Sequence, residues 1–263
     1  MNLLDVGIDA SEIMRVWGCG RVRAVFDPAI YLDLPGGLVV LTTSAAPRGP
    51  LHVRVRGLPA VSRGDVVRVD VDGLRISDQL FPLDAPVWAP QLPTQVSLAA
   101  ARDVAGAWLP PVVPPLGVTG TAGAVLPADV VAALRWGDLA SLGQRLGGRG
   151  PGLTPAGDDM LAGALLVARV IWGRLPPPSD LLRDVATNDI ALAFLRCAAE
   201  GRCIEPAHDL LDALARSDAG ATIRALATLS RFGSSSGAAL AFGVRAALTE
   251  FPTLGPTLSG HTS

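Results

Sequence analysis

The chain of 263 residues contains no lysine, because all 22 of its basic residues are arginines. This absence excludes a Walker-type phosphate site, a Schiff-base enzyme and any reaction that uses lysine as a nucleophile. Anionic ligands must therefore be bound by arginine side chains or by backbone N–H groups. The formal net charge is −2, and no basic cluster with interleaved aromatic residues occurs. We therefore expect no nucleic-acid binding.

Histidine and cysteine are also scarce. The only histidines, His52, His208 and His261, are too scattered to favour a histidine metal site or a Ser-His-Asp triad. The three cysteines show no metal-binding spacing, and we expect Cys197 and Cys203 to be buried, unreactive thiols. An odd number of cysteines, with acidic residues near the start instead of a secretory pattern, favours a reducing cytoplasm.

Long hydrophobic runs are absent, although hydrophobic residues make up 49% of the chain and charged residues only 17%. That balance is ample for a buried core in one large domain or two modest ones. The longest apolar helix predicted, 160–172, is too short to span a bilayer and carries Arg169. We therefore expect no membrane insertion.

Residues 21–76 alternate between apolar and polar in short runs separated by Pro-Gly, Gly-Pro and Asp-Gly turn signals. This pattern predicts antiparallel strands in a small barrel or sandwich, with a tight Asp72-Gly73 hairpin turn. A row of arginines is expected to line a solvated strand face: Arg54, Arg56, Arg63 and Arg68.

The patterning changes from period two to helical between residues 81 and 115. A helix is expected over 97–109, and helical segments follow from residue 127 until a Pro/Gly/Thr/Ser tail after Phe251. The predicted class is α+β, with a small antiparallel β barrel or sandwich before a mainly helical domain. We place the domains at 1–96 and 97–263.

The most informative stretch is 147–169, in which a glycine-rich loop leads through Thr154 and Pro155 into paired aspartates and an apolar helix. Thr154 is a good helix cap and Pro155 suits the first helical position, which places Asp158 and Asp159 in or next to the first turn. The glycines leave N–H groups open to a ligand, and a helix N-terminus attracts anions. With Arg149 inside the loop, the stretch predicts an oxyanion site.

A second helix start resembles the first. Thr154-Pro-Ala-Gly157 is followed six residues later by Gly163, and Ser234-Ser-Ser-Gly237 is followed six residues later by Gly243. One interpretation is that the later glycines let two helices cross closely while the hydroxyls cap. The other is that both starts contact a ligand. Thr187 and Asn188 also allow two interpretations: they cap a new helix, or they contact a ligand.

The aspartates have two uses that the residues alone leave open. Mg²⁺ is commonly held by one or two carboxylates and a substrate phosphate, which makes Asp158 or Asp159 a candidate ligand. Adjacent helical positions point about 100° apart, so both cannot easily face one small ion. One carboxylate would bind and the other would cap.

The stretch GPGLTPAGDDMLAG resembles the signature of a bacterial family that includes a subunit of oxamate carbamoyltransferase, an enzyme of anaerobic allantoin degradation and thus of purine catabolism. TNDIALAFLRCAAEG (187–201) and GSSSGAALAFG (233–243) are similar to two further segments of that family. An acidic residue often follows the family's Ser-Ser-Gly, whereas Ala238 and Ala239 stand here. The resemblance covers most of the second half well and the first half in outline.

The resemblance implies a carbamoyltransferase of the oxamate type, or a subunit of one, that binds a small phosphate or carboxylate and assembles as a hetero- or homo-oligomer. A non-catalytic partner subunit and a Mg²⁺-dependent hydrolase using Asp158 are the alternatives. The candidate catalytic residues are Arg149, Asp158 and Asp159. The candidate substrate-binding residues are Gly150, Gly152, Thr154, Gly157, Thr187, Asn188, Ser235, Ser236 and Gly237.

Overall fold

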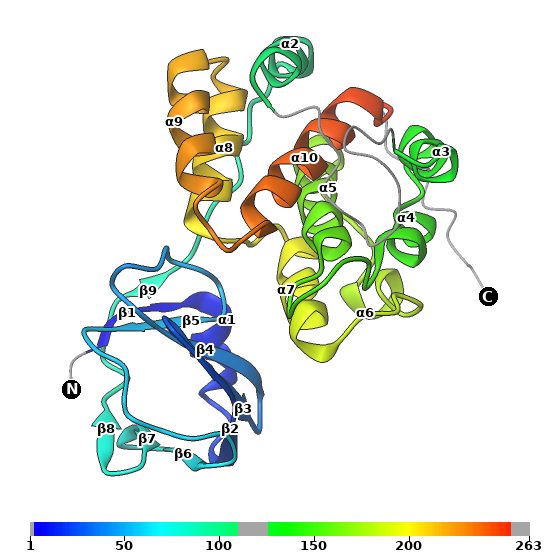
Figure 1. The fold of residues 1–263 in the computed structure, drawn as a ribbon. Helices are drawn as coiled ribbons and strands as arrows, with labels where there is room; N and C mark the ends of the chain where they lie inside the picture. Colours follow the sequence, from blue (N-terminus) through cyan, green and yellow to red (C-terminus); the bar gives the residue numbers. More distant parts are fainter. Residues whose placement is uncertain (1–2, 110–125, 254–263) are drawn as a thin grey trace. The chain divides into compact units, whose positions relative to one another are not determined.

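The structure, a computed structural model, describes residues 3–109 and 126–253. It divides into two compact units, Met1–Pro90 and Gln91–Ser263, and each contains its own cluster of buried apolar side chains. The first unit is built on strands and the second on helices (Figure 1), which confirms the predicted α+β class. Whether 1–96 and 97–263 are independently folding domains stays a prediction.

The first unit, the β unit, consists of one curled sheet in the order β8-β7-β6-β2-β3-β4-β5-β1-β9 and one short helix, α1 (Figure 1). Most neighbouring strands are antiparallel, as the alternation predicts, but β4 pairs with β5 and β1 with β9 in parallel. The elements are β1 (Leu3–Gly7), α1 (Ile8–Ile13), β2 (Gly18–Phe26), β3 (Ala29–Leu34), β4 (Gly37–Thr43), β5 (His52–Val55), β6 (Val66–Asp70), β7 (Gly73–Ile76), β8 (Gln79–Phe81) and β9 (Val87–Trp88).

The alternation of apolar and polar residues buries one face of the sheet against an apolar core, as β6 shows. In β6, Val67 and Val69 are buried, while Val66 and Arg68, which alternate with them, are exposed. Successive side chains of a strand point to opposite faces, so this pattern buries one row against the apolar cluster of the β unit.

Two details of the β unit differ from prediction. The hairpin turn consists of Val71 and Asp72, because Asp70 pairs with Gly73 and Gly73 already belongs to β7. Gly73 has φ +139°, and a Cβ atom there would overlap the Phe81 carbonyl oxygen. The glycine is thus explained by strand packing and not by the turn, which the Asp-Gly signal misplaces by one residue.

Arg54 is the second difference. It does not lie on a solvated face: its side chain is 15% exposed and its Nη2 atom lies 2.7 Å from Asp5 Oδ2. Asp5 and Arg54 are cross-strand partners on β1 and β5, and Arg54 also donates to the Ala46 carbonyl oxygen over 2.9 Å. The arginine therefore ties two strands and a loop together.

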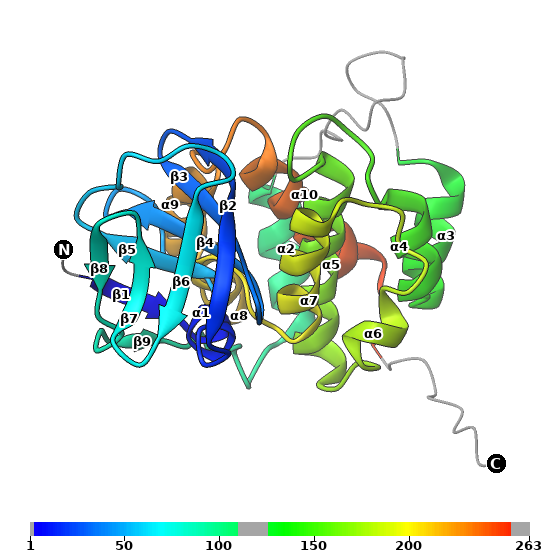
Figure 2. The same ribbon diagram turned by 90° about the horizontal axis from the view of Figure 1, so that it is seen from below.

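The second unit, the helical unit, is organised around α5 and α10, which run side by side in both ribbon views (Figures 1 and 2). All residues of α5 from Ala156 to Ala168 are buried except Asp159. The helices are α2 (Leu98–Trp108), α3 (Ala128–Trp136), α4 (Leu139–Leu146), α5 (Ala156–Trp172), α6 (Pro178–Leu181), α7 (Asp189–Ala199), α8 (Glu205–Ala215), α9 (Ala219–Leu229) and α10 (Ser236–Glu250). In the described ranges, no helix has the length and apolar character that a membrane crossing needs.

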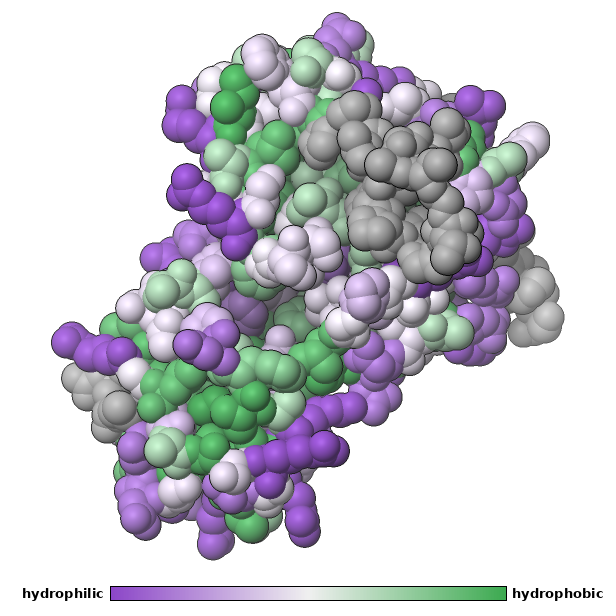
Figure 3. Space-filling model, viewed as in Figure 1, coloured by the Kyte–Doolittle hydropathy of each residue, from purple (hydrophilic) through white to green (hydrophobic). Residues whose placement is uncertain are grey.

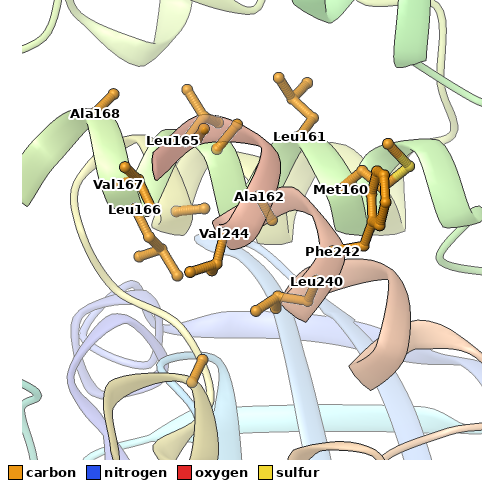
Figure 4. Packing of buried hydrophobic residues seen from close by; sticks show 14 of the residues in the cluster. Met160, Leu161, Ala162, Leu165, Leu166, Val167, Ala168, Leu240, Phe242 and Val244 are labelled. Carbon is orange, nitrogen blue, oxygen red and sulfur yellow. The ribbon is translucent and has the colours of Figure 1, made fainter. Parts of the chain in front are cut away.

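The α5–α10 contact depends on two glycines that face each other's backbone. A Cβ atom on Gly163 would overlap the Leu240 carbonyl oxygen and lie 2.8 Å from Val244 N, and one on Gly243 would overlap the Met160 carbonyl oxygen. Side chains such as Met160, Leu240 and Val244 pack on either side of this crossing (Figure 4). The interpretation that these glycines allow a close helix crossing is confirmed.

We expect Gly163→Ala and Gly243→Ala each to lower the free energy of unfolding by about 1–3 kcal/mol, because the added methyl group has no space between the two backbones. Gly106→Ala in α2 is the matched control, since a Cβ atom there meets no atom within 4 Å. The control should raise stability by about 0.5–1 kcal/mol. Urea unfolding followed by circular dichroism measures all three variants, and equal stabilities would contradict the close crossing.

Candidate functional site

The loop between α4 and α5 has the backbone that its glycines predict. Gly148, Gly150 and Gly152 have φ values of +68°, +111° and +100°, in a region that residues with a Cβ atom rarely adopt. The helix begins one residue later than expected: Pro155 is the N-cap and Ala156 the first helical residue. Thr154 therefore does not cap α5.

The Thr154 hydroxyl instead contacts the second helix start. Its Oγ1 atom lies 3.0 Å from Ser236 Oγ, 82 residues further along the chain. The two similar helix starts thus meet, because the glycine crossing brings α5 and α10 together. A contact with another helix has replaced the local cap that the sequence favours.

Asp158 is the buried anchor of the loop, with only 2% of its surface exposed. Its Oδ1 atom accepts from the Gly148 N–H over 3.0 Å, and its Oδ2 atom accepts from the Thr187 hydroxyl over 2.6 Å. Burial raises the pKa of Asp158, and these two hydrogen bonds partly oppose that rise. Asp158 thus links the loop, α5 and the segment before α7.

Asn188 holds the other end of the loop. Its side-chain oxygen accepts from the N–H groups of Ile190 and Ala191, so it caps α7 as one interpretation predicts. Its Nδ2 atom also donates to the Leu153 carbonyl oxygen over 3.0 Å. The segment before α7 therefore holds the loop at two points: Asn188 contacts Leu153 directly, and Thr187 acts by way of Asp158. No sequence pattern predicts the contacts that Gly148 and Leu153 make.

Gly157 and Gly237 serve packing at the two helix starts. A Cβ atom on Gly157 would overlap the Leu146 carbonyl oxygen, and one on Gly237 would overlap the Leu229 carbonyl oxygen. Both residues are buried. Ser235, the N-cap of α10, makes no side-chain capping bond. Any contact of these three residues with a ligand stays a prediction.

Asp159 differs from its neighbour. Its Oδ2 atom is buried and has no hydrogen-bond partner among the described residues. Burial raises the pKa of Asp159 from 3.8 to about 8; the Ser236 side chain hydrogen-bonds to it and opposes the rise, while the nearby Asp158 adds to it. Asp159 is therefore mostly a neutral carboxylic acid at pH 7.

Several backbone N–H groups of the loop have no backbone hydrogen-bond partner among the described residues. Within residues 3–109 and 126–253, the backbone N–H groups of Gly150, Gly152, Leu153 and Thr154 make no backbone hydrogen bond. A Cβ atom on Gly152 would meet no atom within 4 Å, so the space beside it is open. Arg149 is exposed and adds the charge of its guanidinium. These groups can bind an oxyanion.

A magnesium ion at Asp158 stays a prediction, and the described contacts add no support for it. Both oxygens of Asp158 already accept hydrogen bonds from the protein. The part of the chain that the structure describes also contains no group of three or more His, Cys, Asp or Glu side chains placed to hold a metal. His52 and His208 are buried in separate units, and His261 lies outside the described residues.

The cysteines divide by environment. Cys197 is buried, Cys203 is partly buried and Cys19 is exposed. Burial of the sulfur raises the pKa of Cys203 to about 12, with a further contribution from the charge of Asp159. Cys203 is therefore a thiol at neutral pH, in agreement with an unreactive side chain.

Asp158→Ala should lower the free energy of unfolding by about 1–3 kcal/mol, because it leaves the Gly148 N–H and the Thr187 hydroxyl without their acceptor. Asp158→Asn is the matched control. Its amide can accept from Gly148 and donate to the Thr187 hydroxyl oxygen, so we expect a smaller loss. Urea unfolding of both variants measures the difference. Equal losses would mean that the charge of Asp158 matters more than its hydrogen bonds.

Asp159 should make stability depend on pH. Because its pKa is raised from 3.8 to about 8 on folding, its contribution is fully present below about pH 4 and is lost as the pH rises through about 8. Asp159→Asn stays neutral, so its melting temperature should fall less than that of wild type between pH 4 and 9. Asp158, whose pKa is also raised, acts in the same direction in both proteins. Parallel pH profiles would contradict this assignment.

Comparison with known proteins bears on this same segment. No curated protein and no solved structure matches the chain. The family model of the oxamate carbamoyltransferase subunit AllH matches residues 146–248, a range that begins at the end of α4 and includes every candidate site residue. Over residues 146–248, the chain is thus similar to the family of the oxamate carbamoyltransferase subunit AllH, which confirms the resemblance.

Proposed function

We propose that the helical unit binds a small oxyanion at residues 149–157 and takes part in carbamoyl transfer of the oxamate type, as the enzyme or as a subunit of it. The observation that carries this proposal is the row of unpaired N–H groups at Gly150, Gly152, Leu153 and Thr154, beside an open space and an exposed arginine. The family match over 146–248 supplies the reaction.

The reaction needs hydrogen-bond donors more than it needs a nucleophilic side chain. The nitrogen of a small amide attacks the carbonyl carbon of carbamoyl phosphate, a C–N bond forms, the C–O bond to phosphate breaks, and the nitrogen loses a proton. Negative charge builds up on the carbonyl oxygen and on the departing phosphate. Orientation and hydrogen-bond donors can supply the catalysis, which suits a chain without lysine.

The residues take different roles in this proposal. The loop N–H groups and Arg149 bind the phosphate or carboxylate, and the hydroxyls of Thr154, Ser235 and Ser236 border it. Asp158, Thr187 and Asn188 position the loop through the contacts described above. A loop fixed before the ligand arrives loses less conformational entropy on binding.

Electrostatics favour an anion at this place despite the two aspartates. Burial raises the pKa of both Asp158 and Asp159, and Asp159 is mostly neutral below about pH 8. Arg149 keeps its positive charge at every physiological pH. In its neutral form, Asp159 therefore repels a bound phosphate far less than an exposed carboxylate would.

Gly152→Val should weaken phosphate binding at least tenfold, because the branched side chain would fill the open space and resist a φ of +100°. Gly173→Val is the matched control. Gly173 also has positive φ, +74°, and open space, but it lies at the far end of α5. Calorimetry with phosphate and carbamoyl phosphate compares both variants with wild type. Equal affinities in all three would show that the loop glycines do not bind the anion.

A non-catalytic subunit that docks on a larger transferase is the second candidate, and the surface of the β unit favours it. Hydrophobic side chains gather on the face of that unit shown in Figure 3. Its large apolar side chains that are more than 40% exposed are Val16, Trp17, Val25, Phe26, Val66, Val71 and Val87. An assay of the isolated chain with carbamoyl phosphate and oxamate tests this candidate, because transfer by the isolated chain would contradict a non-catalytic role.

A further inference from the structure

Among the described residues, Oδ2 of Asp159 is the one buried side-chain oxygen at the two helix starts that has no hydrogen-bond partner. Its neighbours are satisfied: Asp158 accepts two hydrogen bonds, and Thr154 contacts Ser236. Buried polar atoms of proteins are rarely left unpaired, so such an atom calls for an explanation. Because Asp159 lies in the first turn after the loop with unpaired N–H groups, its oxygen can serve as a contact for a ligand group.

We propose that Asp159 binds the uncharged carbamoyl or carboxamide end of the substrate while the loop N–H groups bind its oxyanion end. This inference rests on the proposed function and adds the orientation of the ligand and the chemical class that the site selects. Oxamate has a carboxylate next to a carboxamide, and carbamoyl phosphate has a phosphate next to a carbamoyl group. Both molecules thus present the two required ends a short distance apart.

A carboxamide is the group that suits Asp159 in either of its protonation states. The neutral acid donates its O–H to the amide carbonyl oxygen and can accept an amide N–H, whereas the ionised carboxylate still accepts the N–H. A ketone carbonyl can only accept, so it needs the neutral acid. A second carboxylate on the ligand is repelled once Asp159 ionises.

The surroundings keep Asp159 in the neutral state that donates to a carbonyl. Burial is the largest cause of its raised pKa, and the titratable groups that interact with it are Asp158 on the same helix and Cys203 before α8. The charged residues on the helices packed against α5 are Arg145 on α4, Asp189 and Arg196 on α7, and Arg245 and Glu250 on α10. Asp189 and Arg196 are exposed, and Arg145 and Glu250 form ion pairs with Asp129 and Arg135.

Three small ligands test this assignment by calorimetry on the full chain between pH 6 and 9.5. Oxamate carries a carboxamide beside its carboxylate, pyruvate a ketone and oxalate a second carboxylate. We expect wild type to bind pyruvate and oxalate at least about tenfold more weakly at pH 9.5 than at pH 6, because Asp159 with a pKa near 8 loses its proton over that range. Oxamate binding should change less than threefold.

Asp159→Asn provides the matched variant, because its amide stays neutral and nearly isosteric. It should bind pyruvate with an affinity that no longer falls with pH. Identical pH profiles of oxamate and pyruvate on wild type, or a pyruvate profile unchanged in Asp159→Asn, would overturn the proposal. The wild-type comparison decides the matter by itself if the variant does not fold.

The failure of this inference is separable from the failure of the proposed function. Phosphate has no carboxamide end, so its binding at the loop should survive Asp159→Asn and be lost in Gly152→Val. If phosphate behaves in this way while the ligands do not discriminate at Asp159, the anion site stands and the orientation is wrong. If wild type binds neither phosphate nor oxamate, both proposals are overturned.

Discussion

The close crossing of α5 and α10 is the constraint on which the site depends. Gly163 and Gly243 let the two backbones touch, and the helix starts lie a fixed number of residues before those glycines. Thr154 and Ser236 are therefore brought to 3.0 Å from each other. Side chains at both positions would push the helices apart and with them the hydroxyls and Asp159. The packing of small residues in the core thus sets the geometry of polar groups at the helix ends.

The two adjacent aspartates have different roles because their side chains point in different directions from the same helical turn. Neighbouring side chains on a helix point about 100° apart, so Asp158 faces the loop and the segment before α7 whereas Asp159 faces the start of α10. Asp158 accepts hydrogen bonds from two donors and holds the loop in place. Asp159 is left with a buried oxygen that no described residue satisfies, and burial keeps it protonated. A pair that looks alike in sequence therefore divides into an anchor and a group available to a ligand.

The absence of lysine agrees with a site made of backbone donors. The groups of the proposed site are amides of a glycine-rich loop, one exposed arginine, hydroxyls and a neutral acid. Such groups orient a small planar substrate and stabilise developing negative charge, but they do not form covalent intermediates readily. In the carbamoyl transfer proposed above, such groups suit direct transfer between two bound small molecules.

Local patterns in the sequence determined much of this protein. Alternation placed the strands, and Thr154-Pro155 placed the start of α5 within one residue. The glycines of the loop do adopt positive φ values. These features depend on neighbouring residues, whose steric preferences do not require tertiary contacts. The repeated spacing from a hydroxyl to a glycine also indicated that two helix starts are built alike.

Only the tertiary structure decided which partner each polar group has. Thr154 has a strong preference to cap its own helix, yet it contacts Ser236, because the crossing of α5 and α10 offers a partner 82 residues away. Arg54 looks like a surface residue but forms an ion pair with Asp5, since β1 lies beside β5 in the sheet. Thr187 hydrogen-bonds to Asp158, and Asp159 Oδ2 has no partner in the described chain. Burial and long-range pairing are properties of the packed chain, so residue types and spacing could nominate these groups but could not assign their contacts.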